Sequence, residues 1–83
     1  MKSNDFNFDF SKLRGKIVEK FKTQEEFAKA MGCSTQTLNY KLNNKIEFTS
    51  REINKAIKLL DIKNQNEAWQ IFFTKKVEKK STD

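Results

Sequence analysis

Residues 23–44 have the sequence TQEEFAKAMGCSTQTLNYKLNN, which predicts two short helices joined by a tight turn. The letters TQEE at its start form a capping box, in which a Thr and a Glu side chain satisfy backbone N–H groups at the start of a helix. Gly32 ends this helix, because glycine enters the left-handed conformation without a Cβ penalty. Ser34 can cap the second helix through its hydroxyl. The stretch therefore predicts a helix-turn-helix over residues 24–43.

The outer surface of the second helix carries almost no charge. Leu38 and Leu42 lie one turn apart and face inward, which leaves neutral hydrogen-bonding side chains and one lysine outside. In the major groove of DNA, Gln and Asn can pair with adenine, Thr can contact thymine, and Lys can reach phosphate or guanine. We interpret this surface as one that reads DNA; the alternative is the solvent-facing side of an ordinary amphipathic helix. The capped preceding helix, the glycine turn and the basic chain favour DNA reading.

This stretch resembles the helix-turn-helix of lambda-repressor-like proteins, the Cro and CI repressors of temperate phages. The matching residues lie at the start, the turn, the core and the end of the motif: Gln24, Ala28, Gly32, Leu38, Asn43 and Asn44. Over about residues 8–78, the chain is similar to small Cro-like phage and prophage proteins of Gram-positive bacteria. The resemblance implies a compact five-helix domain that binds operator DNA.

The resemblance also implies roles for individual side chains. It places four residues of the second helix against base edges: Thr35, Gln36, Asn39 and Tyr40. It places five residues near the sugar-phosphate backbone: Gln24, Ser34, Lys41, Asn43 and Lys45. Lys41 departs from the family pattern, which usually has an aliphatic residue at this position. Either its stem covers the core, or its ammonium group points to phosphate.

The rest of the chain predicts three further helices. Ser11 can cap a first helix, the run FTSRE at residues 48–52 contains a second capping box, and Asn64 can begin a fifth helix. We therefore predict an all-α fold of five helices. Residues 1–78 form a single domain in this prediction, and residues 79–83 form a flexible polar tail.

The terminal segments are less regular than the helices. Phe6, Phe8 and Phe10 alternate with polar residues, which is the period of a strand, and residues 71–77 could pair with them in a short two-stranded β ribbon. The alternative is that these aromatic side chains close the core without a sheet. The lysines within residues 75–80 also have two interpretations, a solvated tail or an electrostatic arm on the DNA backbone.

Composition argues against most catalytic functions. The 83 residues include no histidine and a single cysteine, Cys33, so the commonest metal ligand and general base is missing and no internal disulfide can form. No Gly-rich phosphate loop, paired-cysteine motif or nucleophile–base pattern appears. We therefore expect no enzyme, no metal and no cofactor. Without a signal peptide or a long apolar run, we expect a cytoplasmic protein of a bacterial host cell with no membrane partner.

The net charge of +6 favours a polyanionic partner. Together with the helix-turn-helix it predicts a sequence-specific DNA-binding transcriptional regulator, a Cro-like repressor of a phage or prophage. Such a protein would read a double-stranded DNA operator as a homodimer. Two alternatives stay open: an anti-repressor or modulator that binds a partner phage repressor, and, with less support, the antitoxin of a toxin–antitoxin pair.

Overall fold

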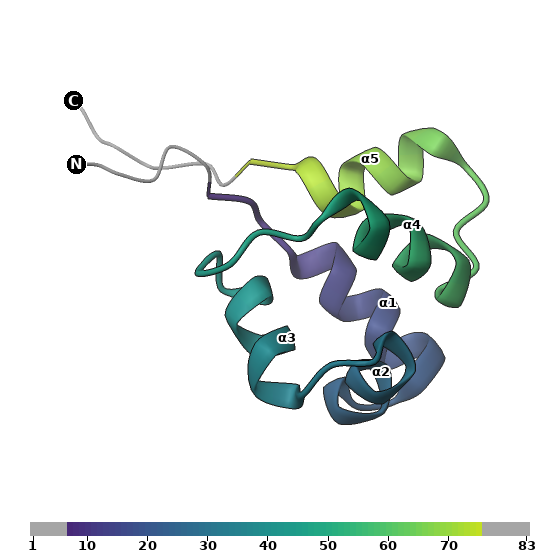
Figure 1. The fold of residues 1–83 in the computed structure, drawn as a ribbon. Helices are drawn as coiled ribbons and strands as arrows, with labels where there is room; N and C mark the ends of the chain where they lie inside the picture. Colours follow the sequence, from purple (N-terminus) through teal and green to yellow (C-terminus); the bar gives the residue numbers. More distant parts are fainter. Residues whose placement is uncertain (1–6, 76–83) are drawn as a thin grey trace, which may run out of the picture.

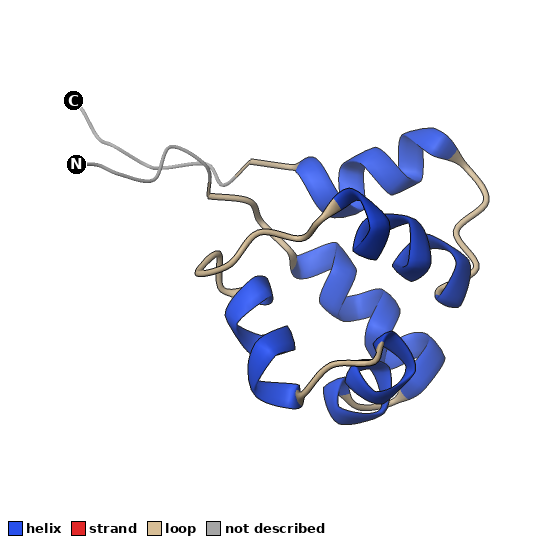
Figure 2. Ribbon diagram, viewed as in Figure 1, coloured by secondary structure: helices blue, strands red, loops and turns tan. Residues whose placement is uncertain are grey.

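Five α-helices make up the fold of residues 7–75, the part of the chain that the computed structural model describes (Figure 1). In chain order they are α1 (Ser11–Phe21), α2 (Gln24–Met31), α3 (Thr35–Leu42), α4 (Ser50–Leu59) and α5 (Gln65–Phe73). Loops alone connect the helices, and the described residues contain no strand (Figure 2). The all-α architecture of five helices that the sequence predicts is confirmed.

Side-chain caps start four of the helices where the sequence predicts them. The hydroxyl oxygen of Thr23 accepts a backbone N–H of the first turn of α2 at 3.1 Å, and Ser34 and Asn64 cap α3 and α5 in the same way. Thr49 and Glu52 form a complete capping box at the start of α4, with N···O distances of 3.1 and 2.9 Å. Each cap satisfies N–H groups that a helix end leaves without a partner, which is worth about 1 kcal/mol.

The first helix begins differently from the prediction. Ser11 is its first helical residue rather than its cap, and Phe10 holds the N-cap position without a side-chain hydrogen bond. Oδ1 of Asp9 accepts the N–H of Ser11 at 3.0 Å. The carboxylate of Asp9 therefore satisfies an N–H group at the start of α1 from two residues upstream, although this is not the N–H that a capping Ser11 hydroxyl would accept.

Helix α1 contacts both α2 and α5, and α2 in turn contacts α3 and α4 (Figure 1). On the surface, an ion pair of 3.1 Å between Lys16 and Glu67 joins α1 to α5. Every helix contributes to one hydrophobic core, whose most deeply buried side chains are Leu13, Ile17, Phe27, Ala28, Leu38, Ala56, Leu60, Ile71 and Phe72. The two ends of the described chain lie side by side (Figure 1).

The two terminal segments meet through a single antiparallel bridge between Phe8 and Lys75, next to a hydrogen bond of 2.7 Å from Asp9 N to Thr74 O. Within the described residues the predicted β ribbon does not form, because residues 71–73 continue α5 and bury Ile71 and Phe72 in the core. The alternative, in which the aromatic side chains close the core without a sheet, describes this end of the molecule. Phe6, Val77 and the predicted tail of residues 79–83 lie outside the described residues.

The two glycines predict opposite effects of the same substitution. Gly32→Ala places a side chain at φ 85°, so we expect a loss of about 1–2 kcal/mol in the free energy of unfolding. The loss comes from the backbone alone, because the new Cβ would lie 3.9 Å from Nζ of Lys55, an ordinary contact. Gly15→Ala lies inside α1, where a Cβ meets no described atom within 4 Å, and we expect a gain of about 0.5–1 kcal/mol. Urea unfolding followed by far-UV circular dichroism measures both; changes of equal sign would contradict this account.

Candidate functional site

The residues that the sequence predicts to face DNA bases do share one exposed side of α3. Thr35, Gln36 and Asn39 are exposed, and Tyr40 keeps 39% of its surface accessible. Two hydrogen bonds connect residues along this side: Nε2 of Gln36 donates to the Tyr40 hydroxyl at 2.9 Å, and Nδ2 of Asn43 donates to the backbone carbonyl of Asn39 at 2.8 Å. The predicted polar face therefore exists as a continuous surface, and the DNA contacts assigned to it stay predictions.

Lys41 is the member of the predicted phosphate set that the structure turns away from solvent. Its side chain is 8% exposed, and its ammonium group lies 3.0 Å from Oε1 of Glu52 and donates to the backbone carbonyl of Glu47 at 3.2 Å. The ammonium group also lies over the ring of Phe48, 5.9 Å from its centroid. The prediction of a phosphate contact is corrected here, because the stem covers the core and the charge is neutralised inside the protein.

The other predicted phosphate contacts occupy different environments. The Ser34 hydroxyl accepts the N–H of Thr37 at 3.0 Å as the cap of α3, and Gln24 is the half-buried first residue of α2. Oδ1 of Asn43 accepts a hydrogen bond of 3.3 Å from Arg14. Lys45 is exposed. These residues remain on the surface, and their contacts with DNA stay predictions.

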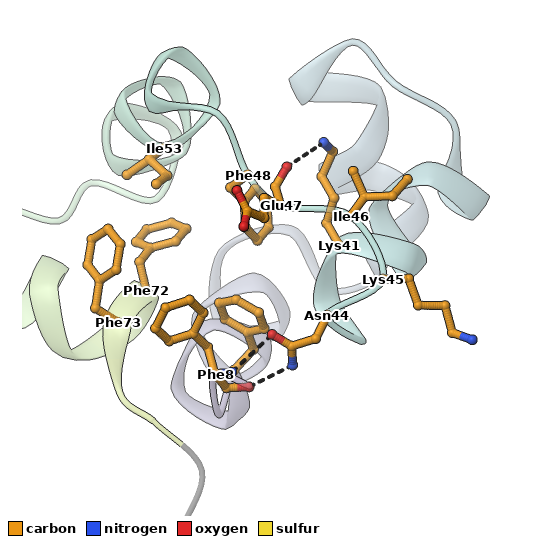
Figure 3. Close-up of a pocket in the computed structure, with 11 residues that line it drawn as sticks. Phe8, Lys41, Asn44, Lys45, Ile46, Glu47, Phe48, Ile53, Phe72 and Phe73 are labelled. Carbon is orange, nitrogen blue, oxygen red and sulfur yellow. Dashed lines mark hydrogen bonds between the residues drawn. The ribbon is translucent and has the colours of Figure 1, made fainter. Parts of the chain in front are cut away.

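A hollow beside this face was not predicted. It lies where the loop between α3 and α4 passes the N-terminal segment and the end of α5, and has a volume of about 460 Å³ (Figure 3). We call it the aromatic groove; its lining consists of Phe8, Phe10, Lys41, Asn44, Lys45, Ile46, Glu47, Phe48, Ile53, Phe72 and Phe73. Most of its wall is aromatic or aliphatic, so it is suited to an apolar side chain.

Asn44 holds the N-terminal wall of the aromatic groove in place. Its side-chain Oδ1 accepts the N–H of Phe8 at 3.0 Å, and its Nδ2 donates to the carbonyl of Phe8 at 2.9 Å (Figure 3). The backbone of Asn44 is left-handed, with φ 63°. The sequence indicates only that Asn tolerates this conformation. The paired hydrogen bonds to a residue 36 positions earlier have no local sequence signal.

Ring contacts connect the aromatic groove to an exposed tryptophan. Phe8 makes an edge-to-face contact with Phe73 at 5.8 Å between centroids, and Phe73 lies 4.6 Å from the ring of Trp69. Trp69 is 64% exposed and Ile46, in the groove wall, is 41% exposed. Large exposed apolar side chains beside a hollow mark a surface that can bind another molecule.

Lys41, a lining residue of the aromatic groove, forms an ion pair with Glu52, which lies outside the lining. Burial acts to raise the pKa of the Glu52 carboxyl, but hydrogen bonds from the Thr49 N–H and from Lys41 outweigh it, so this pKa lies below its ordinary value. The Glu52 carboxyl is therefore ionised near neutral pH, and its negative charge balances the charge of Lys41. The described residues contain no cluster of side chains suited to a metal ion, and Cys33 is a half-buried free thiol.

Comparison with known proteins assigns the chain to a family. Residues 6–75 match the model of DUF739, described as a protein of unknown function, and the chain belongs to this family. Among solved structures, it is similar to the modulator of repression (MOR) of the temperate bacteriophage TP901-1 from Lactococcus lactis, with 40% identity and a TM-score of 0.67. The match covers 83% of this chain and 93% of that chain. A search of curated proteins found no match.

The prediction that the chain belongs with the Cro and CI repressors is wrong. The matching family is DUF739, and the similar solved structure is a modulator of repression. The residues behind that prediction do form the expected elements: Thr23 caps α2, Gly32 ends it and Leu38 is buried. A cap, a glycine and an inward leucine are what any two short helices joined by a tight turn require. They predict the local fold and cannot distinguish one family with this fold from another.

No helix among residues 7–75 has the length and apolar character that crossing a membrane requires.

Proposed function

We propose that this protein is a regulator that modulates a repressor by binding the repressor protein itself. The observation that carries the proposal is the 40% identity to a phage modulator of repression over most of both chains. This corresponds to the second interpretation of the sequence, in which a helix-turn-helix fold binds a partner repressor. No catalytic activity and no cofactor form part of the proposal.

The surface of the molecule supports binding to a protein. Trp69 and Ile46 are large exposed apolar side chains; Ile46 lines the aromatic groove, and Trp69 lies against Phe73 of its wall. Tryptophan is enriched among residues that dominate protein interfaces. Lys41, the cation that would have projected from α3 towards phosphate, is instead paired with Glu52. Helix α3 therefore presents less positive charge to solvent than a DNA-reading helix would.

We predict that the protein forms a stable complex with the repressor encoded in the same phage or prophage. Isothermal titration calorimetry and size-exclusion chromatography with light scattering measure the complex and its stoichiometry, and the second method also tests the predicted homodimer. Because a basic chain binds DNA without sequence preference at about 10⁻⁴–10⁻⁶ M, mobility shifts compare the operator with a scrambled duplex. We expect the protein alone to treat both duplexes alike and to change the operator shift of the repressor.

Selective binding of the operator by the protein alone, without any complex with the repressor, would overturn the proposal in favour of a DNA-binding regulator. If a neighbouring gene encodes a toxic protein and this protein neutralises it, the result would favour the antitoxin alternative instead.

A further inference from the structure

We propose that the aromatic groove is the docking site for the partner, and that it takes a bulky apolar side chain from a partner segment with flanking carboxylates. The inference rests on the proposed function, since it assumes that the partner is a protein. It adds the surface that binds and the chemistry of the segment that is bound.

The dimensions of the aromatic groove fit a side chain. Its volume of about 460 Å³ falls in the range of binding pockets, about 300–1,000 Å³, so that a Leu, Phe or Trp side chain can enter. Ile46 forms part of the wall, and its apolar side chain is 41% exposed to water. Covering this surface with an apolar side chain removes it from water, which is the main driving force of association.

The aromatic groove is held in shape before any partner arrives. Phe8 is fixed by two hydrogen bonds to Asn44, and edge-to-face contacts join Phe10 to Phe48 at 5.5 Å and Phe48 to Phe72 at 5.6 Å. A site with fixed walls loses little conformational entropy on binding. The aromatic groove is therefore a better candidate for an anchor than the polar side chains of α3.

Charge identifies the flanks of the bound segment. Lys45 lines the aromatic groove, and Lys75 forms the β-bridge with Phe8, a residue of the groove wall. Lys45 and Lys75 are both exposed. Among the described residues, no carboxylate lies within ion-pair distance of either lysine. Glu47 is the acid of the lining, and no ion pair within residues 7–75 involves it, because Lys41 pairs with Glu52 instead. Around the aromatic groove, the two lysines therefore outnumber the single glutamate, and the whole chain has a net charge of +6. Both charges favour an acidic partner segment.

The test measures affinity of the full-length chain for the repressor in two matched pairs of variants. Ile46→Ala shortens an exposed apolar side chain in the aromatic groove, and Val18→Ala does so on α1, where Val18 is 60% exposed and outside the lining. Lys45→Glu reverses a charge at the groove, and Lys58→Glu makes the same change on α4, outside the lining. All four residues are exposed, so circular dichroism should show folded proteins.

We expect Ile46→Ala to weaken binding by at least about fivefold, as side chains in the centre of an interface do. Lys45→Glu should slow association, more at low than at high salt, while Val18→Ala and Lys58→Glu leave the affinity within about twofold. The sole tryptophan, Trp69, stacks on Phe73 of the groove wall, so a shift of its fluorescence on binding is a further expected result. A repressor variant without tryptophan is used as the partner, so that the fluorescence comes from Trp69 alone.

Two patterns of results would overturn the inference in different ways. If the unmodified protein binds the repressor and both groove variants bind as tightly as their controls, the partner docks elsewhere and the proposed function stands. If the unmodified protein does not bind the repressor, the proposed function and the docking site are both wrong.

Discussion

Phe27→Ala will remove a large part of the stability of this protein, with an expected loss of about 3–5 kcal/mol in the free energy of unfolding. Phe27 is fully buried, and its ring lies 5.2 Å from that of Phe21 between α1 and α2. Because α2 also contacts α3 and α4, a cavity here loosens four of the five helices. A domain of this size has only about 5–15 kcal/mol to lose.

Thermal unfolding followed by far-UV circular dichroism measures this loss. For a domain of about 60–100 residues, each 1 kcal/mol lowers the midpoint by about 4–8 °C, so we expect a fall of more than about 10 °C. Val18→Ala is the matched control, because it also shortens an apolar side chain but at an exposed site, where changes stay within about 0.5 kcal/mol. Equal midpoints for the two variants would show that Phe27 is not part of the stabilising core.

Much of the fold could be predicted from the sequence because its signals are local. The caps at Thr23, Thr49 and Asn64 lie within three residues of the N–H groups they satisfy, and Gly32 acts on its own backbone. These patterns depend on nothing outside one helix. The predicted start of α1 was wrong by one residue, because Ser11 is the first helical residue and its N–H is accepted by Asp9.

The candidate site could not be predicted, because its residues come together only through packing. Phe8 and Asn44 are 36 positions apart, and the rings of Phe48 and Phe72 meet only once α4 and α5 are placed. The sequence shows an aromatic alternation at the N-terminus, which indicated a strand or a core closure and offered no reason to expect a groove. The family was mistaken because the matching residues build two short helices joined by a tight turn, which different families with this fold share.

The position of Lys41 illustrates how far a local pattern extends. Its place on α3 allowed either a buried stem or a contact with phosphate, and the choice depends on Glu52, a residue of the next helix. The complete capping box shows why Glu52 is in reach: the carboxylate is held at the start of α4 by the N–H of Thr49. One acid thus begins a helix and neutralises a buried cation.

Glu52→Gln should therefore destabilise the protein by about 3 kcal/mol, because it leaves the 8% exposed ammonium group of Lys41 without an anion. Gln can still complete the capping box, so the loss reports on the charge. Lys41→Met should cost less, since the Glu52 side chain is 33% exposed and water can solvate it. The double variant should return close to the stability of the unmodified protein, because Lys41→Met removes the charge that Glu52→Gln leaves without an anion, so a neutral pair of similar volume replaces the ion pair. Urea unfolding of all four proteins gives the coupling energy.

The dependence of stability on pH tests the same pair. The pKa of Glu52 is lower in the folded than in the unfolded chain, so the unfolded chain binds the proton more readily. The stabilisation is present above the unfolded pKa of about 4.5 and is lost as the pH falls through the folded value. Between about pH 7 and pH 3, the unmodified protein should lose more stability than Glu52→Gln, which has no proton to bind at this site. Parallel curves for the two proteins would mean that neither the Thr49 N–H nor Lys41 lowers the pKa of Glu52 in the folded protein, which would contradict this account.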